Sequence, residues 1–420
     1  MLAASLVALF FSATTPAAAP LSDAEIRAIL ASRVGPENDG VGIVVGIIGP
    51  RGRRIVSYGN VDGNTAFEIA SVTKVFTALL LADMVRRGEV ALTDPVSKYV
   101  PDADGRITLV DLATHTAGLP FADGAPSHDI GVWEYSNVGY RFLGEALEAR
   151  SGMSFEHLLQ ARILQPLRLH DTAITLPPAL KAKLAAGHDA SLQPAPPWYE
   201  IPGYSKMQAA GGIVTTTNDL LSFLAVALGY QRSSLAPAMA SMLATQRPTS
   251  ASPSASRQAL GWLMIGDPAD PLIVHDGGSW GYGSSVAWDP KMGIGVVVLS
   301  NQIGDVGDIA RHLLRPGIPL TGTKHVKHTE IVLAPAILDS YAGRYEAKGE
   351  GVFVIAREAG GLTIESPADW GLPKQRLRPE SERDFFDSEL PLRVTFQSNG
   401  RGMVVYPPRG QDGVVATRIE

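Results

Sequence analysis

The hydrophobic positions of this 420-residue chain change their spacing along its length. Residues 41–48 (VGIVVGII) form a nearly continuous apolar run, "GPRG" supplies turn residues, and residues 53–58 can return as a second strand. Similar runs come back at residues 261–267 and 272–277, and in the hairpin SSVAWDPKMGIGVVVLSN, whose turn lies at residues 289–293. The pattern predicts strands at both ends of a first domain.

The residues between these strands have the spacing of helices. Helices are expected at residues 72–87, 137–150 and 218–228, and a glycine that can end the helix follows each within two positions. Thr216 and Asp219 form a capping-box pattern at the start of the third helix. Strands at both ends with helices between them predict an α/β domain, in which one antiparallel sheet is built from both ends of the domain and a helical region is inserted.

After residue 338 short alternating runs dominate (GVFVIA, GLTIE, LRVTFQ, GMVVYP, GVVATRI), separated by Gly, Pro, Ser and Asp. This spacing is typical of a small β-barrel or β-sandwich. We therefore expect a first domain at residues 20–318, a linker with Pro, Gly and a small basic cluster at 319–335, and a small all-β, lipocalin-like domain at 336–420. The proline-rich stretch 192–204 is expected to cover the first domain rather than to form its core.

The first residues are typical of a secretory signal, predicted at residues 1–19. A short apolar run at residues 2–11 precedes SATTPAAAP, which contains an A-x-A cleavage pattern at 17–19. That run is too short to span a bilayer, and no later segment is long and apolar enough to do so. The sequence thus predicts an exported protein, periplasmic or secreted, without a membrane span.

Composition excludes several functions. The formal net charge of −6 offers no basic field for nucleic acid, which is therefore not an expected partner. The absence of cysteine excludes disulfides, thiolate metal sites and a cysteine nucleophile. No spacing of histidines and carboxylates resembles a metal site, so no metal and no cofactor are expected. The oligomeric state stays open.

Two serines compete as nucleophile. Residues 277–281 (GGSWG) fit G-x-S-x-G, the strand-to-helix elbow of many esterases, with Ser279 at its centre. That elbow needs a helix after the serine, whereas the residues that follow Ser279 are rich in glycine and lead into a hairpin. An α/β-hydrolase that uses Ser279 is therefore the weaker alternative.

Ser71 is the stronger candidate, because the lysine three positions later, Lys74, lies one turn further on the same face of an apolar helix. The amides and the dipole at the helix N-terminus can stabilise an oxyanion formed at Ser71. The same field, with partial burial, favours a neutral Lys74 that can accept a proton.

Tyr135-Ser136-Asn137 supplies polar groups at the entry to a second helix. A loop just ahead of a helix can carry Tyr135 and Asn137 into a cleft. The structural alternative is a helix N-cap beside a core aromatic residue. His115, in THTAGLP, is interpreted as a structural hydrogen-bonding residue.

The order Ser71-x-x-Lys74, Tyr135-Ser136-Asn137 and His275-Asp276-Gly277 resembles the penicillin-recognising serine hydrolases, closest to the class C beta-lactamases and their relatives, D-alanyl-D-alanine peptidases and esterases. The resemblance covers residues 22–315 and includes LTDPVSKYVP, LATHTAGLP, AAGGIVTTTNDLLSFL and VVVLSN. The C-terminal part is similar to a small β-domain that some members carry.

The resemblance implies roles for these residues. It makes Ser71 the nucleophile, Lys74 and Tyr135 the proton-transfer pair, and Asn137 a hydrogen-bonding group near the substrate and Lys74. The implied reaction cleaves an amide or ester bond in a beta-lactam, a D-alanyl peptide or a small ester. A penicillin-binding sensor that is acylated at Ser71 without turnover has a similar sequence and is kept as an alternative.

The third motif is expected to close the site. The resemblance implies that His275, Asp276 and Gly277 bind substrate, and that the amide of Gly278 completes the oxyanion hole with that of Ser71. Asp276 departs from the family pattern, which has a hydroxyl there that helps to hold a substrate carboxylate. An aspartate facing the cleft would repel that carboxylate and favour uncharged substrates; alternatively, Asp276 points away and only fixes the turn.

Overall fold

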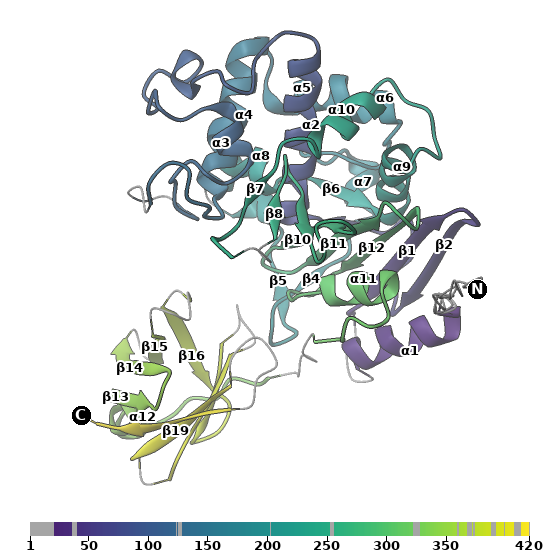
Figure 1. Ribbon diagram of the computed structural model, residues 1–420. Coiled ribbons are helices and arrows are strands. Elements are labelled where there is room, and N and C mark those ends of the chain that lie inside the picture. The colour runs from purple at the N-terminus through teal and green to yellow at the C-terminus, as the bar shows by residue number, and fades with distance from the viewer. Residues whose placement is uncertain are drawn as a thin grey trace, which may run out of the picture.

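The structure, a computed structural model, consists of a larger mixed α/β domain and a smaller β-barrel that follows it in the chain (Figure 1). The predicted signal segment, residues 1–19, lies outside the described residues. The structure describes residues 21–35, 40–122, 124, 128–201, 203–252, 256–321, 328–358, 361–367, 372, 374–387, 392–398, 400–406 and 413–419.

An antiparallel sheet of eight strands forms the centre of the larger domain, in the order β2-β1-β12-β11-β10-β9-β8-β7. β1 pairs with β12, with Val45 opposite Val298, which confirms that the sheet is built from both ends of the domain. The strands are β1 (Ile43–Gly49), β2 (Gly52–Tyr58), β7 (Arg247–Pro248), β8 (Arg257–Gln258), β9 (Leu263–Ile265), β10 (Leu272–Gly278), β11 (Gly283–Asp289) and β12 (Ile294–Ser300).

The helical region is inserted between β2 and β7. Its helices are α2 (Thr73–Arg86), α3 (Leu109–Ala113), α4 (Asn137–Ser151), α5 (Phe155–Leu159), α6 (Gln165–Leu167), α7 (Pro178–Lys181), α8 (Gln208–Gly211), α9 (Thr217–Ala227) and α10 (Ala236–Met242). A π-helical turn covers Gln160–Leu164, and 3-10 turns cover Ala70–Val72, Val96–Lys98, Trp198–Glu200 and Tyr204–Met207. Two small sheets pair β3 (Ala66–Glu68) with β6 (Val214–Thr216) and β4 (Gly187–His188) with β5 (Pro194–Ala195).

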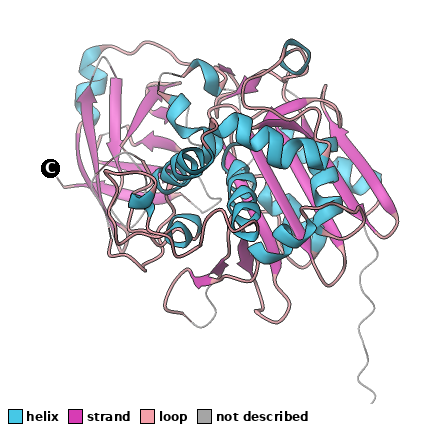
Figure 2. Cartoon of the chain, turned by 90° about the horizontal axis from the view of Figure 1, so that it is seen from above, coloured by secondary structure: helices cyan, strands magenta, loops and turns pink. Residues whose placement is uncertain are grey.

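Both faces of the main sheet are covered, which explains why its strands read as continuous apolar runs. Val44 and Ile48 of β1 face the main core with α2 and α9. Ile43 and Val45 face a second core, formed with α1 (Asp23–Val34) and α11 (Gly307–Leu314). Figure 2, the view from above, shows helices lying across the strands.

The helix ends follow the sequence signals in part. Gly152, with φ +70°, ends α4 in the left-handed conformation that glycine adopts without strain. The Thr216 side chain accepts a hydrogen bond from the Asp219 amide at 3.3 Å, as in a capping box. The Asp219 carboxylate does not complete the box, because it accepts from the backbone N–H of Asp171 and the hydroxyl of Thr172.

The described residues of the proline-rich stretch at 192–204 mostly cover the larger domain, as expected, but one of them enters the core. Trp198, in a 3-10 turn of this stretch, is buried in the main hydrophobic core. Its backbone N–H also donates a hydrogen bond to the buried carboxylate of Glu68 at 2.7 Å. The prolines prevent a long helix, and apart from Trp198 the described residues of the stretch are exposed or half-buried.

The C-terminal domain is a closed barrel in which each strand pairs with the next and β13 pairs with β20. This arrangement confirms the barrel and excludes the sandwich. A core of its own fills it, including Phe353, Phe385 and Phe396. The elements are α12 (Pro335–Tyr341), β13 (Gly343–Ala347), β14 (Gly351–Glu358), β15 (Gly361–Glu365), β16 (Gln375–Pro379), β17 (Asp384–Phe386), β18 (Arg393–Phe396), β19 (Gly402–Tyr406) and β20 (Val414–Arg418).

The predicted linker, residues 319–335, is only partly described, since residues 322–327 lie outside the described part of the chain. Its second half packs on the barrel: the His328 ring stacks on Phe386 at 4.5 Å, and the Ile331 N–H donates to the Pro379 carbonyl. Among the described residues, no helix has the length and apolar character needed to cross a membrane.

Candidate active site

Ser71 lies in the 3-10 turn Ala70–Val72, which leads directly into α2. The preceding Ala70 has φ +42°, a conformation that residues with a Cβ rarely adopt and that is enriched at active sites. Among the described residues, the Ser71 backbone N–H has no hydrogen-bond acceptor. A free amide at a helix N-terminus is suited to bind an oxyanion.

The Lys74 side chain is fully buried, and its amine lies within hydrogen-bond distance of three oxygens. Its Nζ lies 3.1 Å from the Ser71 Oγ, 2.7 Å from the Asn137 Oδ1 and 2.7 Å from the carbonyl oxygen of Ala210. Burial lowers the pKa of the Lys74 amine well below its ordinary value, because water no longer solvates the charged form. Lys74 is therefore positioned to exchange a proton with Ser71.

The Tyr135 ring also lies close to this lysine, with its centroid 5.0 Å from the Lys74 Nζ. Burial raises the pKa of its hydroxyl above the ordinary value, while a hydrogen bond with Ser71 opposes that rise. The Ser136 hydroxyl caps α4 by accepting from the Gly139 amide at 2.9 Å. The N-cap residue Ser136 thus lies between Tyr135 and Asn137, and Asn137 begins the helix.

His115 holds the loop that carries Tyr135. Its Nδ1 accepts a hydrogen bond from the Ser136 N–H at 3.1 Å, and its ring packs 4.4 Å from that of Tyr135. Burial, followed by the nearby Lys74 and His275, lowers the pKa of His115 well below its ordinary value. The geometry agrees with the structural role expected from the sequence.

The third motif forms the far wall of the site on β10. A Cβ on Gly277 would lie 2.3 Å from the Ile69 carbonyl oxygen and 3.1 Å from the Ser71 nitrogen, so only glycine allows this close approach. A Cβ on Gly278 would meet no atom within 4 Å, so this residue borders open space. Gly277 therefore allows the strand to lie against the turn that carries Ser71, and Gly278 leaves space beside it.

His275 and Asp276 point to opposite faces of the sheet, as neighbours on a strand do. Burial, then the charge of Lys74, lowers the pKa of His275 to about 3. Its Nδ1 lies 2.8 Å from the Asp276 carbonyl oxygen, an acceptor, so the neutral ring carries its proton there and leaves Nε2 as an acceptor. His275 is therefore an uncharged wall of the site.

The carboxylate of Asp276 is held on the α11 side. It accepts hydrogen bonds from the Ser285 hydroxyl at 2.6 Å and from the Arg311 guanidinium at 2.6 Å. A Cβ on Gly307 of α11 would lie 2.5 Å from its oxygen, which shows how closely helix and carboxylate pack. Of the two orientations left open by the sequence, the geometry agrees with the one directed away from Ser71.

Ser279 does not have the surroundings of an elbow nucleophile. Its hydroxyl donates to the Glu68 carboxylate at 2.7 Å, and the chain enters β11 at Gly283 instead of a helix. Burial raises the pKa of Glu68 to about 7, although the hydrogen bonds from Trp198 and Ser279 oppose this rise. Ser279 therefore links β10 to Glu68, just ahead of the Ser71 turn.

Sequence reasoning missed three contributors to the site: the carbonyl of Ala210, the carboxylate of Glu68 and the hydroxyl of Ser284. Ser284 donates to the Ile69 carbonyl at 2.8 Å and so joins β11 to the Ser71 turn. A charged residue within the apolar stretch AFEIA was a signal for Glu68. No side-chain pattern marks a backbone carbonyl such as that of Ala210. Within the described part of the chain, no cluster of three or more His, Asp or Glu could hold a metal ion.

Comparison with known proteins identifies the family. The family model described as Beta-lactamase matches residues 26–315, more than half of the chain, and the chain therefore belongs to the beta-lactamase family. It is 28% identical to a beta-lactamase of Pseudomonas fluorescens over 66% of this chain and 94% of that protein. It is also 27% identical to the D-alanyl-D-alanine-carboxypeptidase/endopeptidase AmpH of Escherichia coli K12, over 67% of this chain and 86% of that protein.

Solved structures give the same result for the fold. A beta-lactamase from Sulfitobacter sp. EE-36 matches with a TM-score of 0.61 and 25% identity, over 71% of this chain and 98% of that chain. A class C beta-lactamase from Rhodobacter sphaeroides matches with a TM-score of 0.60 and 24% identity, over 70% and 97%. The larger domain has the class C beta-lactamase fold, followed here by the eight-stranded barrel.

The close approach of Gly277 to the Ser71 turn gives a testable prediction. Gly277→Ala should displace Ile69 and Ser71, lower the free energy of unfolding by about 1–3 kcal/mol and reduce hydrolysis. Gly278→Ala is the matched control for stability, because its added methyl group meets open space. Thermal unfolding of both variants checks this: equal melting temperatures would contradict the close contact.

Proposed function

We propose that this protein hydrolyses an ester or amide bond through an acyl-serine intermediate on Ser71. The observation that supports this most is the 3.1 Å contact between Ser71 Oγ and a fully buried Lys74 Nζ. A buried amine of lowered pKa is the form of lysine that accepts a proton. Family membership supports the same reaction type.

In the proposed reaction the neutral Lys74 takes the Ser71 proton as Oγ attacks the substrate carbonyl. The amides of Ser71 and Gly278 bind the oxyanion of the tetrahedral intermediate. Tyr135, hydrogen-bonded to Ser71, relays the proton to the leaving group, which departs as an alcohol or amine. Water then attacks the acyl-serine, and the acid product leaves with Ser71 restored. Asn137 orients Lys74 through the 2.7 Å hydrogen bond.

The proposed substrates are uncharged esters or amides. His275 is neutral, and Arg311, on the far side of β10, already pairs with Asp276 at 2.6 Å and lies 3.6 Å from Asp305. Neither side chain therefore offers an unpaired cation to a substrate carboxylate. Beta-lactams and D-alanyl peptides, which carry such a carboxylate, are the second candidates because relatives are named for them. We also propose export to the periplasm or medium, on the signal pattern at residues 1–19.

Ser71→Ala should abolish hydrolysis, lowering turnover by roughly a thousandfold or more, and should prevent labelling by a serine-directed probe. Ser279→Ala is the matched control and should keep most activity. A panel of short-chain ester, chromogenic cephalosporin and D-alanyl peptide substrates provides the assay. A dead Ser279→Ala enzyme beside an active Ser71→Ala enzyme would reverse the assignment, and a burst without turnover would indicate a sensor.

The proton-transfer pair is tested by Lys74→Arg and Tyr135→Phe, each expected to lower kcat by roughly 10²–10⁴-fold with little unfolding. Arginine cannot act as the base, and phenylalanine lacks the hydroxyl. In the unchanged protein, kcat/KM should fall only as the pH drops through the lowered pKa of Lys74, far below the ordinary range of lysine. A rate that rises only as the pH approaches the ordinary lysine pKa would contradict the proposed base.

Substrate charge preference is tested by Asp276→Thr. The carboxylate and Arg311 lie on the α11 side of β10, away from Ser71, so this change breaks their 2.6 Å ion pair without placing a cation or a hydroxyl beside the substrate. The ratio of kcat/KM for a cephalosporin to that for a neutral ester should therefore change by less than about threefold, while the melting temperature falls. Asp305→Asn, which removes the weaker acidic neighbour of Arg311, is the control and should lower the melting temperature less. A gain of about tenfold or more for the cephalosporin alone would contradict this placement of Asp276.

A further inference from the structure

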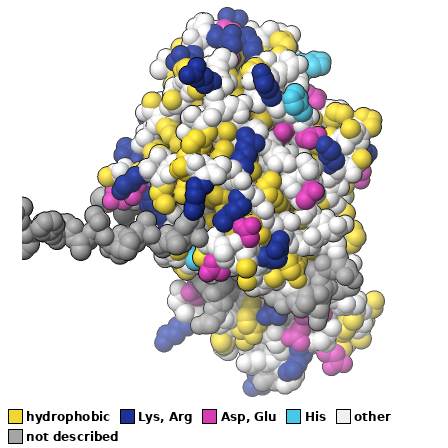
Figure 3. Space-filling model, turned by 90° about the vertical axis from the view of Figure 1, so that its right-hand side faces the viewer, with side chains coloured by type: hydrophobic (Ala, Val, Ile, Leu, Met, Phe, Trp, Pro, Cys, Tyr) yellow, Lys and Arg dark blue, Asp and Glu magenta, His cyan; other side chains and the backbone are white. Residues whose placement is uncertain are grey.

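A second cavity, of about 530 Å³, lies away from the residues of the candidate active site, between the start of β2, the end of α6 and the segment after α9. Arg53, Arg168, Arg232 and His170 line it, together with polar groups of Ser222 and Gln231. The elements that line it, β2, α6 and α9, lie on the right in Figure 1. Figure 3 views the molecule from that side and shows Lys and Arg side chains on the surface. No acidic side chain is among the lining residues that the structure describes.

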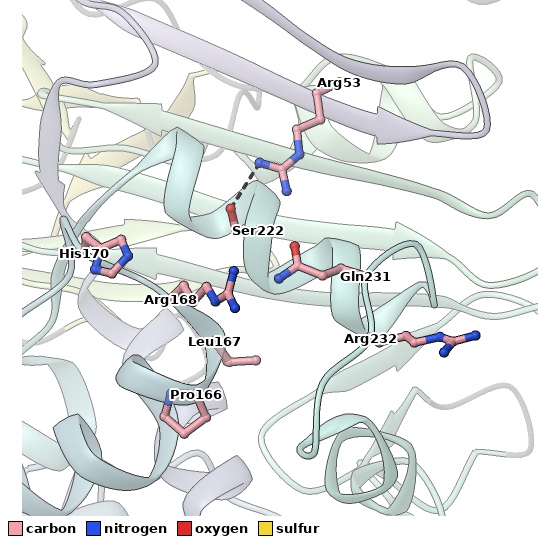
Figure 4. A pocket seen from close by; sticks show the side chains of 8 residues that line it. All are labelled: Arg53, Pro166, Leu167, Arg168, His170, Ser222, Gln231 and Arg232. Atoms are coloured by element: carbon pink, nitrogen blue, oxygen red, sulfur yellow. Dashed lines mark hydrogen bonds between the residues drawn. The ribbon is translucent and has the colours of Figure 1, made fainter.

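The three arginines of this cavity form no ion pair with an acidic side chain of the described residues, while His170 lies close enough to Asp219 to act on the pKa of that carboxyl. Arg53 donates to the Ser222 hydroxyl at 3.0 Å, which fixes its guanidinium at one side of the cavity (Figure 4). The side chains of Arg168 and Arg232 make neither a hydrogen bond nor an ion pair with any described residue. The whole chain has a net charge of −6, whereas the unpaired guanidinium groups give this cavity a positive local potential.

The backbone of Arg168 is a second, independent observation. This residue ends α6 with φ +56° and ψ +42°, the left-handed conformation that glycine occupies in most helix ends. A side chain with a Cβ destabilises this conformation. Within the described residues, no hydrogen bond or ion pair of the Arg168 side chain compensates for that strain. In Figure 4 its guanidinium points into the space beside Gln231.

We propose that this cavity binds a small anion carrying a diphosphate group. The planar guanidinium groups of Arg53 and Arg168 can each donate two parallel hydrogen bonds to phosphate oxygens. The amide of Gln231 adds a donor, and the His170 ring can donate a hydrogen bond. A volume of about 530 Å³ accommodates a diphosphate and a small attached group. The cavity does not include Ser71, so a test of anion binding is independent of the proposed hydrolysis.

The test is a titration of the purified full chain with inorganic pyrophosphate at constant ionic strength, followed by calorimetry and thermal unfolding. We expect saturable binding with a dissociation constant of about 1 mM or lower, and a melting temperature that rises with ligand. Arg168→Gly should keep the unliganded melting temperature or raise it by about 1–3 °C, because glycine relieves the strain. The same variant should bind pyrophosphate about tenfold more weakly or worse.

Arg86→Ala is the matched control, since it removes an exposed arginine at the end of α2 outside the cavity and should leave binding unchanged. Arg53→Gln should weaken binding as Arg168→Gly does. Tighter binding of a nucleoside diphosphate than of pyrophosphate would show that the attached group also fills the cavity, and equal binding that the diphosphate alone is recognised. Absence of saturable binding, or equal weakening by Arg86→Ala and Arg168→Gly, would overturn the proposal.

Discussion

The buried amino group of Lys74 forms no ion pair with a described carboxylate, and much of the larger domain is arranged around it. Transfer of an ammonium group from water into a protein interior costs several kcal/mol, so the neutral amine is favoured. Its three neighbours are neutral oxygens: the neutral amine can donate to Asn137 and Ala210 and accept from the Ser71 hydroxyl. A carboxylate at this place would keep the lysine charged, whereas these oxygens hold it and leave its pKa low.

This placement requires that α2 be buried on all sides along most of its length. Nearly every residue from Thr73 to Met84 is buried, and Phe76 packs against Phe223 of α9 with ring centroids 4.9 Å apart. A helix can be enclosed in this way only if strands and helices from distant parts of the chain meet around it. The pairing of β1 with β12 brings the two ends of the domain together and so places β10 beside the Ser71 turn.

The two faces of β10 also differ in charge. Neutral groups face Ser71, and the ion pair lies on the opposite face, beside α11. His275 faces the site and is uncharged, while Asp276 pairs with Arg311 on the other face of the sheet. Glu68, close to the Ser71 turn, is buried with hydrogen bonds from Trp198 and Ser279 but without a cation among the causes of its raised pKa. The low charge of the site thus has two causes. Successive side chains of β10 point to opposite faces of the sheet, and Glu68 is buried.

The sequence by itself determined the local features. Ser71 and Lys74 share a helix face because their spacing is close to one helical turn, and glycines such as Gly152 end helices because of their own backbone freedom. It also indicated the sheet and the C-terminal β-domain, since alternation and turn residues are local signals. The orientation of Asp276 could not be read from it, because the position of Arg311 on α11 depends on packing.

Contacts between distant parts of the chain were decided by the tertiary structure alone. The Ala210 carbonyl reaches Lys74 across 136 positions, and Glu68 meets Ser279 across 211. Likewise, closure of the barrel instead of a sandwich depends on the pairing of its first and last strands, which no local pattern specifies. Local propensities fix what each segment becomes, while the partners of a buried polar group are set only when the core has formed.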